Sequence, residues 1–192
     1  PKPGDTVIVT GAAGGVGSIA GQIFKIAGCE VYGIAGGKEK CEMLINDFGF
    51  DGAIDYKSED LNESLNKLCP NGADIVYDNV GGRILNDCLL HLSLNARIAI
   101  CGIISRHKTD NMNFGPENYS NLIFKRATME GFLVLDYMSE APIARSKMKK
   151  WIEDGKLICK EDLREGFENI PDTLKGLFDG KNKGKQLLKI TN

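Results

Sequence analysis

The sequence is short of the residues that most often build metal or acid–base centres, and its charges nearly balance. Two histidines, His91 and His107, and one tryptophan stand among 192 residues. Lysine and arginine number 24 and aspartate and glutamate 26, so the formal charge is −2. A protein held electrostatically to nucleic acid normally has a basic excess, so we expect no nucleic-acid partner. No apolar run approaches the roughly 18 residues that span a membrane, so we expect no membrane partner.

Cysteine is present, but its spacing does not indicate a metal site or a redox pair. No two cysteines are arranged as C-x-x-C, and most lie in apolar runs. This distribution favours reduced thiols in the core of a cytoplasmic protein. We therefore expect no metal and a cytoplasmic location, and we interpret His91, which lies in an apolar stretch, as structural. The cysteines are Cys29, Cys41, Cys69, Cys88, Cys101 and Cys159.

Short β-branched and apolar runs alternate with segments in which apolar residues recur at helical spacing. This alternation is typical of a parallel sheet with a helix in each crossover. Because such crossovers are right-handed, we predict an α/β fold, a Rossmann-type doubly wound parallel sheet with helices on both faces. Residues 1–155 form this domain in our interpretation, and residues 156–192 form a C-terminal segment with one helix and one strand. The expected strands cover 6–10, 31–35, 53–56, 74–78, 96–101 and 129–135.

Local signals give three finer expectations. Ser58 is expected to cap the following helix, which carries Leu61. An apolar helical stripe is expected to run from Ile84 to Leu92. Residues 109–116 are expected to form a polar loop.

Glycine is abundant, with 23 residues, and it clusters where a ligand could approach the backbone. The stretch VTGAAGGVG at positions 9–17 follows a strand and opens a helix, which is the context of a dinucleotide fingerprint. Gly14 would let the backbone approach a pyrophosphate, and Gly17 would let the helix pack on the sheet. Backbone N–H groups at the helix start would bind the phosphates. Ala12 replaces the first glycine of the usual pattern, and a glycine-rich turn without a ligand remains the alternative.

Two other enzyme classes share parts of this pattern. Positions 10–17 also fit T-G-x-x-x-G-x-G of the short-chain dehydrogenases, which need Tyr-x-x-x-Lys for proton transfer. No tyrosine of this chain is followed by lysine at that spacing. An S-adenosylmethionine methyltransferase would also have a doubly wound sheet, but it would need an acid at the tip of the second strand, where Gly36 and Gly37 stand.

The end of the second strand indicates which dinucleotide would bind. An acid at this tip accepts hydrogen bonds from the ribose of NAD, whereas lysine attracts the 2′-phosphate of NADP. The sequence AGGKEK at 35–40 has no acid at the tip and provides Lys38 and Lys40, so we predict NADP(H). Glu39 opposes this interpretation, and a solvated first helical turn is the alternative.

Two further stretches follow expected strands. DNVGG at 78–82 comes after the fourth strand, and CGIIS at 101–105 ends the fifth. Ligands of open α/β sheets bind beyond the carboxyl ends of the strands, so both stretches are candidates for the nicotinamide side of the site. Ordinary strand-to-helix turns are the alternative.

Together these stretches resemble the zinc-free medium-chain dehydrogenases/reductases, in the branch of prostaglandin reductase and 2-alkenal (double-bond) reductase. The resemblance extends over essentially the whole chain. It is carried by GAAGGVGS at 11–18, GGKEK at 36–40, FD at 50–51, YK at 56–57, DNVGG at 78–82, CGIIS at 101–105, MEGF at 129–132 and GKNKGK at 180–185.

The resemblance implies roles for the matching positions. Lys40 would contact the 2′-phosphate, and Tyr56 would lie near the adenosine. Asn79 would lie near the cofactor ribose, and Asn182 would close over the nicotinamide. The pyrophosphate would be held by Gly14, Gly15, Val16 and Gly17, and the nicotinamide would be flanked by Cys101, Gly102, Ile103, Ile104, Ser105, Phe132, Leu133 and Val134.

The implied chemistry is hydride transfer from NADPH to the C=C bond of an α,β-unsaturated aldehyde or ketone, or to a quinone, without a metal. For an enone the hydride goes to the β-carbon, and the enolate is then protonated. We assign no catalytic acid. Tyr137 is a candidate donor, with an ordinary core or surface tyrosine as the alternative.

The sequence departs from the family in two places. His107 stands where relatives often have tyrosine, and the family places a GroES-like substrate domain before the Rossmann domain. Because the chain begins at Pro1, close to its first strand, we expect it to be a piece of a longer protein or a processed product. Residues from about Gly166 would pack on that absent domain.

Two further expectations concern function and assembly. A stand-alone NADP(H)-binding or sensing module without catalysis is the alternative function. A homodimer through the sheet edge at 129–135 is plausible.

Overall fold

A six-stranded parallel sheet forms the centre of the molecule, as the sequence predicted. The structure is a computed structural model that describes residues 1–105 and 116–190. His107 and nearly all of the expected polar loop over 109–116 lie outside the described residues. The strands are β1 (Thr6–Thr10), β2 (Glu30–Ala35), β3 (Gly52–Asp55), β4 (Ala73–Asp78), β5 (Leu92–Ile100) and β6 (Thr128–Gly131), in the spatial order β3-β2-β1-β4-β5-β6.

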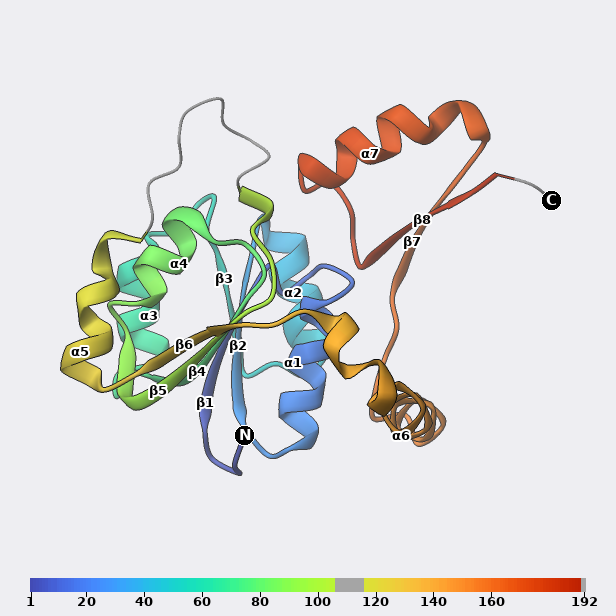
Figure 1. Cartoon of the computed structure of the whole chain (residues 1–192). Coiled ribbons are helices and arrows are strands. Elements are labelled where there is room, and N and C mark those ends of the chain that lie inside the picture. The colour runs from blue at the N-terminus through green and yellow to red at the C-terminus, as the bar shows by residue number, and fades with distance from the viewer. Residues whose placement is uncertain (106–115, 191–192) are drawn as a thin grey trace.

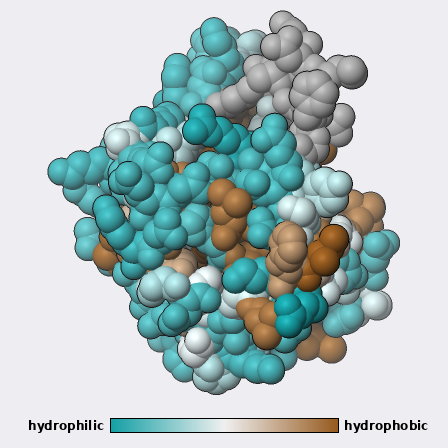
Figure 2. All heavy atoms as spheres, turned by 90° about the vertical axis from the view of Figure 1, so that its left-hand side faces the viewer, coloured by the Kyte–Doolittle hydropathy of each residue, from teal (hydrophilic) through white to brown (hydrophobic). Residues whose placement is uncertain are grey.

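Helices cover both faces of this sheet (Figure 1), which confirms the Rossmann-type fold. One face carries α1 (Gly17–Ile26) and α2 (Lys38–Asn46). The opposite face carries α3 (Leu61–Leu68), α4 (Gly82–Cys88) and α5 (Asn121–Lys125). The face with α3 to α5 is mostly hydrophilic, with scattered apolar side chains (Figure 2).

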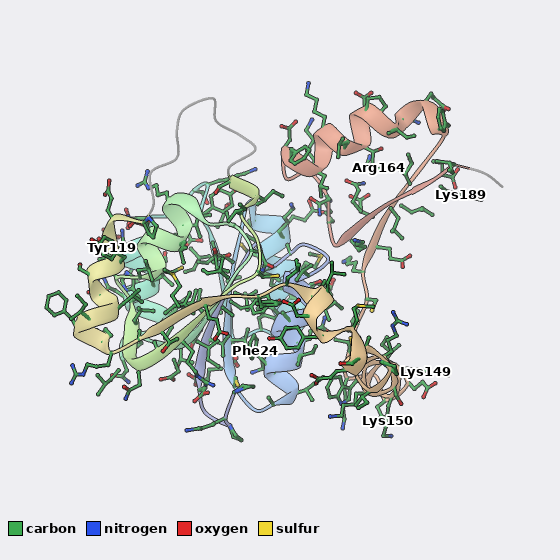
Figure 3. The ribbon with its side chains drawn as sticks, viewed as in Figure 1. Phe24, Tyr119, Lys149, Lys150, Arg164 and Lys189 are labelled. Carbon is green, nitrogen blue, oxygen red and sulfur yellow. The ribbon has the colours of Figure 1, made fainter. Side chains whose placement is uncertain are left out.

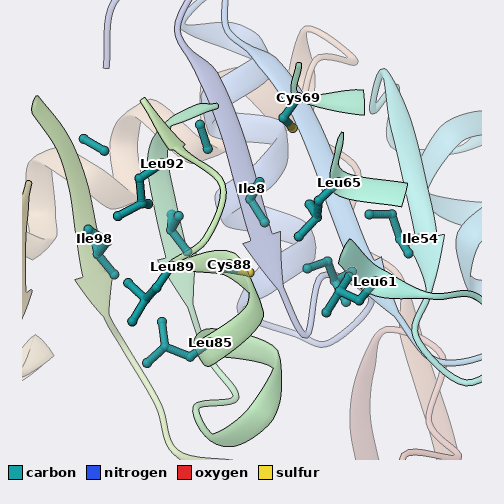
Figure 4. Close-up of a cluster of buried hydrophobic side chains, with 14 residues drawn as sticks. Ile8, Ile54, Leu61, Leu65, Cys69, Leu85, Cys88, Leu89, Leu92 and Ile98 are labelled. Atoms are coloured by element: carbon teal, nitrogen blue, oxygen red, sulfur yellow. The ribbon is translucent and has the colours of Figure 1, made fainter. Parts of the chain in front are cut away.

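The core lies between the sheet and these two helical layers. Ile8, Leu65 and Leu89 are fully buried in the cluster between the sheet, α3 and α4 (Figure 4). A second cluster packs α1 and α2 on the other face, and Phe24 of α1 packs against it (Figure 3). Burial on both faces explains why the central strands read as continuous apolar runs. Because all pairings of this sheet are parallel, the carboxyl ends of its strands lie along one edge.

The winding direction changes beside β1. β1 pairs in parallel with β2 on one side and with β4 on the other. The next connections therefore run to opposite sides, which leaves a crevice beyond the carboxyl ends of β1 and β4. The glycine motif follows β1 at this point.

The expected cap of α3, the expected end of the apolar helix at Leu92 and the expected end of the sixth strand were wrong. Asp60, not Ser58, caps α3, because its carboxylate accepts from Glu63 N at 2.9 Å while the Ser58 hydroxyl donates to Asp55. Leu92 begins β5 rather than ending a helix, since α4 stops at Cys88. The sixth strand ends at Gly131, because the chain turns into the 3-10 helix η3 (Val134–Glu140).

The C-terminal part contains a small ribbon outside the main sheet (Figure 1). β7 (Glu161–Glu165) pairs in parallel with β8 (Lys185–Lys189), and α7 (Ile170–Phe178) connects them after the short 3-10 helix η4 (Phe167–Asn169). The sequence EDLRE of β7 is so charged that no strand was expected there. The remaining helices are η2 (Glu117–Ser120), before α5, and α6 (Ala141–Glu153), which bears the exposed Lys149 and Lys150 (Figure 3).

A buried glutamine ties the chain after α6 to the main domain. The Gln22 amide of α1 accepts from Ile158 N at 2.8 Å and donates to Ile158 O at 2.9 Å. Leu157, next to it, is 2% exposed. These contacts place the start of the C-terminal segment against α1.

Four of the six thiols are buried. Cys29, Cys41, Cys69 and Cys88 lie in the core, whereas Cys101 is half-buried and Cys159 is exposed. All six are free. Burial raises the pKa of the Cys41 thiol to about 11 and that of Cys69 to about 12, so both stay protonated at neutral pH.

Candidate functional site

The glycine motif after β1 forms a turn that only glycine can complete. Gly11 has a φ of 57°. A Cβ atom on Gly17 would lie 2.4 Å from the Gly11 carbonyl oxygen and 2.8 Å from the Ala12 Cα atom. The absence of a side chain at Gly17 therefore lets α1 begin directly against the turn. Helix α1 has no acidic residue in its first turn, so the positive end of its dipole is not neutralised locally.

A cavity of about 930 Å³ opens at the carboxyl edge of the sheet, beside this turn. Its wall includes the glycine motif, the end of β2, the ends of β4 and β5, and part of the C-terminal segment. Gly102 lies against the backbone of Asn79, where a Cβ atom would come within 2.8 Å of the carbonyl oxygen. This volume and a wall of bare backbone suit a long, flat ligand with phosphate groups.

A buried carboxylate fixes the end of β4. Asp78 is fully buried and accepts from the Thr10 hydroxyl at 2.6 Å and from Gly81 N at 2.9 Å. Burial raises the pKa of Asp78, although these hydrogen bonds stabilise its ionised form. The neighbouring Asn79 amide donates to Thr10 O at 2.7 Å. Asp78 and Thr10 therefore lock the turn that presents Asn79 to the cavity.

A second carboxylate organises the turn after β2. Asp55, at the end of β3, accepts from Gly37 N at 2.7 Å and from the Ser58 hydroxyl at 2.8 Å. Burial raises the pKa of Asp55, but these bonds outweigh it and the net pKa is lowered. Gly36 lies under Lys57 and Tyr56, since a Cβ atom there would be 2.8 Å from Lys57 Cε. The tip of β2 is thus a bare backbone surrounded by a lysine and a tyrosine.

The loop after α7 closes one side of the cavity. Gly184 N donates to Ala13 O at 3.0 Å, and a β-bridge joins Gly14 with Gly184. Asn182 is 7% exposed, and its amide donates to Gly184 O at 2.9 Å. Lys40 Nζ donates to Gly180 O at 2.7 Å. The glycine motif and the first turn of α2 are therefore both bound to the C-terminal segment.

The structure brings most of the residues expected for a cofactor site to this one cavity. Its wall contains Gly14, Gly15, Val16, Gly17, Lys40, Tyr56, Asn79, Cys101, Gly102, Ile104, Ser105 and Asn182. Their individual roles stay predictions.

Four residues expected beside the nicotinamide, and the candidate proton donor Tyr137, do not line the cavity. Ile103 is exposed beside Gly81, and Leu133 and Val134 are exposed after β6. Phe132 packs instead between two tyrosines. Its ring centroid lies 6.2 Å from that of Tyr77 and 6.4 Å from that of Tyr137. The chain leaves the sheet at Gly131, which carries Phe132, Leu133 and Val134 away from the cavity.

Sequence reasoning missed several wall residues. Lys185 crosses the motif so closely that a Cβ atom on Gly15 would lie 2.7 Å from Lys185 Cδ. Gln186 and the end of α7 also line the cavity. The repeated glycines at 180 and 184 could have indicated this approach, since both have positive φ. Within residues 1–105 and 116–190, no group of three or more His, Cys, Asp or Glu side chains could hold a metal.

Comparison with known proteins agrees with this geometry. A family model described as zinc-binding dehydrogenase matches residues 15–150. The chain belongs to the zinc-binding dehydrogenase family. The 2-alkenal reductase (NADP(+)-dependent) of Nicotiana tabacum is 44% identical across all of this chain and 56% of its own length. Prostaglandin reductase 1 of Bos taurus is 42% identical across 98% of this chain and 57% of its own length.

A solved structure is also very similar to this chain. The crystal structure of CurA from Vibrio vulnificus in complex with NADPH superposes with a TM-score of 0.94, at 42% identity over this whole chain and 58% of that chain. The resemblance to prostaglandin and 2-alkenal reductases is thereby confirmed. The chain spans less than two thirds of the length of each of these relatives. The structure contains no helix, in the part of the chain that it describes, long and apolar enough to cross a membrane.

Proposed function

We propose that this chain is the NADP(H)-binding part of a zinc-independent oxidoreductase that reduces the C=C bond of α,β-unsaturated aldehydes or ketones, or a quinone. The observation that carries the proposal is the cavity that joins the glycine turn after β1 to Lys40 and to the ends of β4 and β5. The names of the tobacco and bovine relatives, and the NADPH in the Vibrio complex, support the choice of cofactor and reaction.

The residues of the cavity fit such a cofactor in a definite order. Gly14 to Gly17 would hold the pyrophosphate at the start of α1, and Lys40 would contact the 2′-phosphate. Tyr56 would face the adenosine, and Asn79, held by Thr10, would face the second ribose. Cys101 and its neighbours would lie beside the nicotinamide.

NADPH, when bound, supplies the hydride. The part of this chain is to orient the cofactor by means of the turn held by Asp78 and to cover the site with the loop around Asn182. We assign no proton donor. Tyr137, the candidate, is 51% exposed and packs edge-on against Phe132.

The division of the chain and its assembly belong to the same proposal. We propose a Rossmann domain over residues 1–155 and a segment over 156–192 that packs on a GroES-like domain of the longer protein. Exposed apolar side chains of the segment, Leu163, Phe167 and Leu174, support this role. We further propose a cytoplasmic homodimer that forms through the edge strand β6. A sedimentation coefficient that does not change with concentration in the micromolar range and corresponds to a monomer would contradict the dimer.

Calorimetric titration with NADPH and NADH tests the cofactor assignment. We expect the chain to prefer NADPH, and Lys40→Ala to weaken NADPH binding by about 1–3 kcal/mol through loss of a charge-assisted contact. NADH binding should change much less. Lys38→Ala is the matched control, because Lys38 lies in the same helical turn and its side chain is 88% exposed. Equal losses for both cofactors would contradict the 2′-phosphate assignment.

The same titration, together with an activity assay of the longer protein, distinguishes the reductase hypothesis from the sensing-module hypothesis. NADPH binding, followed by reduction of an enone such as a 2-alkenal once the longer protein is assayed, supports the reductase. Binding of NADPH without turnover in the longer protein would favour an NADP(H)-sensing module. Failure of the chain to bind either dinucleotide would contradict both.

A further inference from the structure

The first turn of α2 combines the lysine expected to bind phosphate with a carboxylate that would repel it. Lys40 lines the cavity, and Glu39, the acidic residue of that turn, directly precedes it. A 2′-phosphate carries a charge between about −1 and −2 at neutral pH, so an uncompensated Glu39 would oppose its binding. The proposed preference for NADPH therefore requires something to neutralise Glu39.

The C-terminal loop supplies that neutralising charge. Lys183 Nζ donates to Glu39 Oε1, and the two residues come from distant parts of the chain. The hydrogen bond and the positive charge of Lys183 lower the pKa of Glu39. Glu39 is consequently a paired carboxylate, although its side chain stays 72% exposed.

The loop is fixed on both sides of Lys183. Asn182 is buried and bonded to Gly184, and Gly184 is bonded to Ala13 beside the glycine motif. An ion pair between two mobile surface side chains contributes little, because both must be ordered to form it. Here the backbone that carries Lys183 is already ordered, and Lys40 is bound to the same loop through Gly180 O.

We propose that Lys183 is a specificity-determining residue that masks the charge of Glu39 and so permits a 2′-phosphate to bind beside Lys40. The C-terminal segment would then take part in choosing NADPH over NADH, although the choice is usually located at the end of β2. This inference rests on the proposed NADP(H) function. NADH has no phosphate at this position, so its binding is insensitive to the pair.

The test is the NADPH-to-NADH affinity ratio of the full chain and its Lys183→Met variant. At low ionic strength we expect the variant to bind NADPH about three- to fivefold more weakly, with NADH within twofold. Glu39→Gln added to Lys183→Met should restore the NADPH affinity, which a purely structural role of Lys183 would not predict. The loss should shrink in high salt, because exposed charges are screened.

Lys181→Met is the matched control. Lys181 lies in the same loop, and its side chain is 70% exposed near Asp179, at 3.8 Å. We expect its affinity ratio to equal that of the unmodified chain. Equal weakening of both dinucleotides by Lys183→Met, or no rescue by Glu39→Gln, would overturn the role of Lys183 while leaving NADPH binding established. Absence of any NADPH binding by the unmodified chain would overturn the proposed function and this inference with it.

Discussion

Two glycines of one motif serve different purposes, although sequence patterns treat them alike. Gly17 has no room for a side chain, because a Cβ atom would lie 2.4 Å from the Gly11 carbonyl oxygen. Gly14 has more space, since its Cβ atom would lie 3.4 Å from the same oxygen, but it lines the cavity. We therefore interpret Gly17 as a requirement of folding, and we propose that Gly14 is a requirement of ligand approach.

This difference predicts that a substitution of Gly17 lowers stability, whereas a substitution of Gly14 removes ligand binding. Gly17→Ala should lower the free energy of unfolding by roughly 2–3 kcal/mol, because the backbone must shift to admit the methyl group. Gly14→Val should leave helix content intact and abolish NADPH binding. Urea unfolding followed by circular dichroism, together with calorimetry, measures both effects. A Gly14→Val chain that still binds NADPH would refute the pyrophosphate assignment.

His91 provides a pH-dependent contribution to stability. The residue is 9% exposed, and its Nε2 atom is 3.0 Å from Asn62 Oδ1. Burial lowers the pKa of His91 in the folded state, so the unfolded chain takes up the proton first as the pH falls. The stabilisation is therefore complete above the unfolded pKa of about 6.5 and is lost as the pH falls below it towards the folded pKa.

The expected observation is a fall in the free energy of unfolding between pH 7.5 and pH 5.5. His91→Gln should have a smaller fall over the same interval, since glutamine does not titrate. Urea titrations of both chains at several pH values provide the comparison. Parallel slopes for the two chains would exclude His91 as the source.

At the scale of elements, the link between α1 and the C-terminal segment depends on one side chain. Gln22 satisfies both the N–H and the C=O of Ile158, as a neighbouring strand would. Gln22→Leu would leave both groups without these partners, so local opening of the segment should become easier by roughly 1–3 kcal/mol. Hydrogen exchange should speed up over residues 157–189 and stay unchanged in β1 and β4. A uniform increase along the chain would contradict a local effect.

Some of these elements were predictable from the sequence and others were not. The strands of the main sheet were predictable because burial on both faces selects continuous apolar runs, as in β1 around Ile8. β7 was not predictable, because EDLRE is exposed and is a strand only by pairing with β8. The cap of α3 was missed because Asp60 and Ser58 are both good capping residues, and the side-chain bond of Ser58 to Asp55 depends on tertiary structure.

The location of the candidate site was predictable from the sequence, but the contacts between distant parts of the chain were not. Glycine and lysine motifs at strand ends identify a common edge, because parallel strands end together. The contact between Lys183 and Glu39 joins residues whose separation in sequence gives no local pattern. The side chains after Gly131 were misplaced because the point where an edge strand ends depends on the chain that follows it.

At the scale of the whole molecule, we expect the proposed cofactor site to depend on the C-terminal ribbon, and the main sheet to fold without it. The contacts of the ribbon with the main domain include those to Ala13, Gly14 and Lys40, which line the cavity. A chain that ends at residue 160 retains the buried Leu157, and it retains Ile158 with its hydrogen bonds to Gln22 of α1. We expect it to keep its sheet and to lose most of its affinity for NADPH. Near-native binding by this shortened chain would show that the ribbon is dispensable.

The bridge between Gly14 and Gly184 has a consequence for synthesis in the cell. A growing polypeptide releases the six main strands from the ribosome well before Gly184 emerges, so the sheet is able to fold while the pocket is still open on one side. The proposed dinucleotide would then meet a finished binding surface only on chains whose translation has passed this glycine. Retention by an immobilised nucleotide would accordingly separate completed chains from prematurely terminated ones.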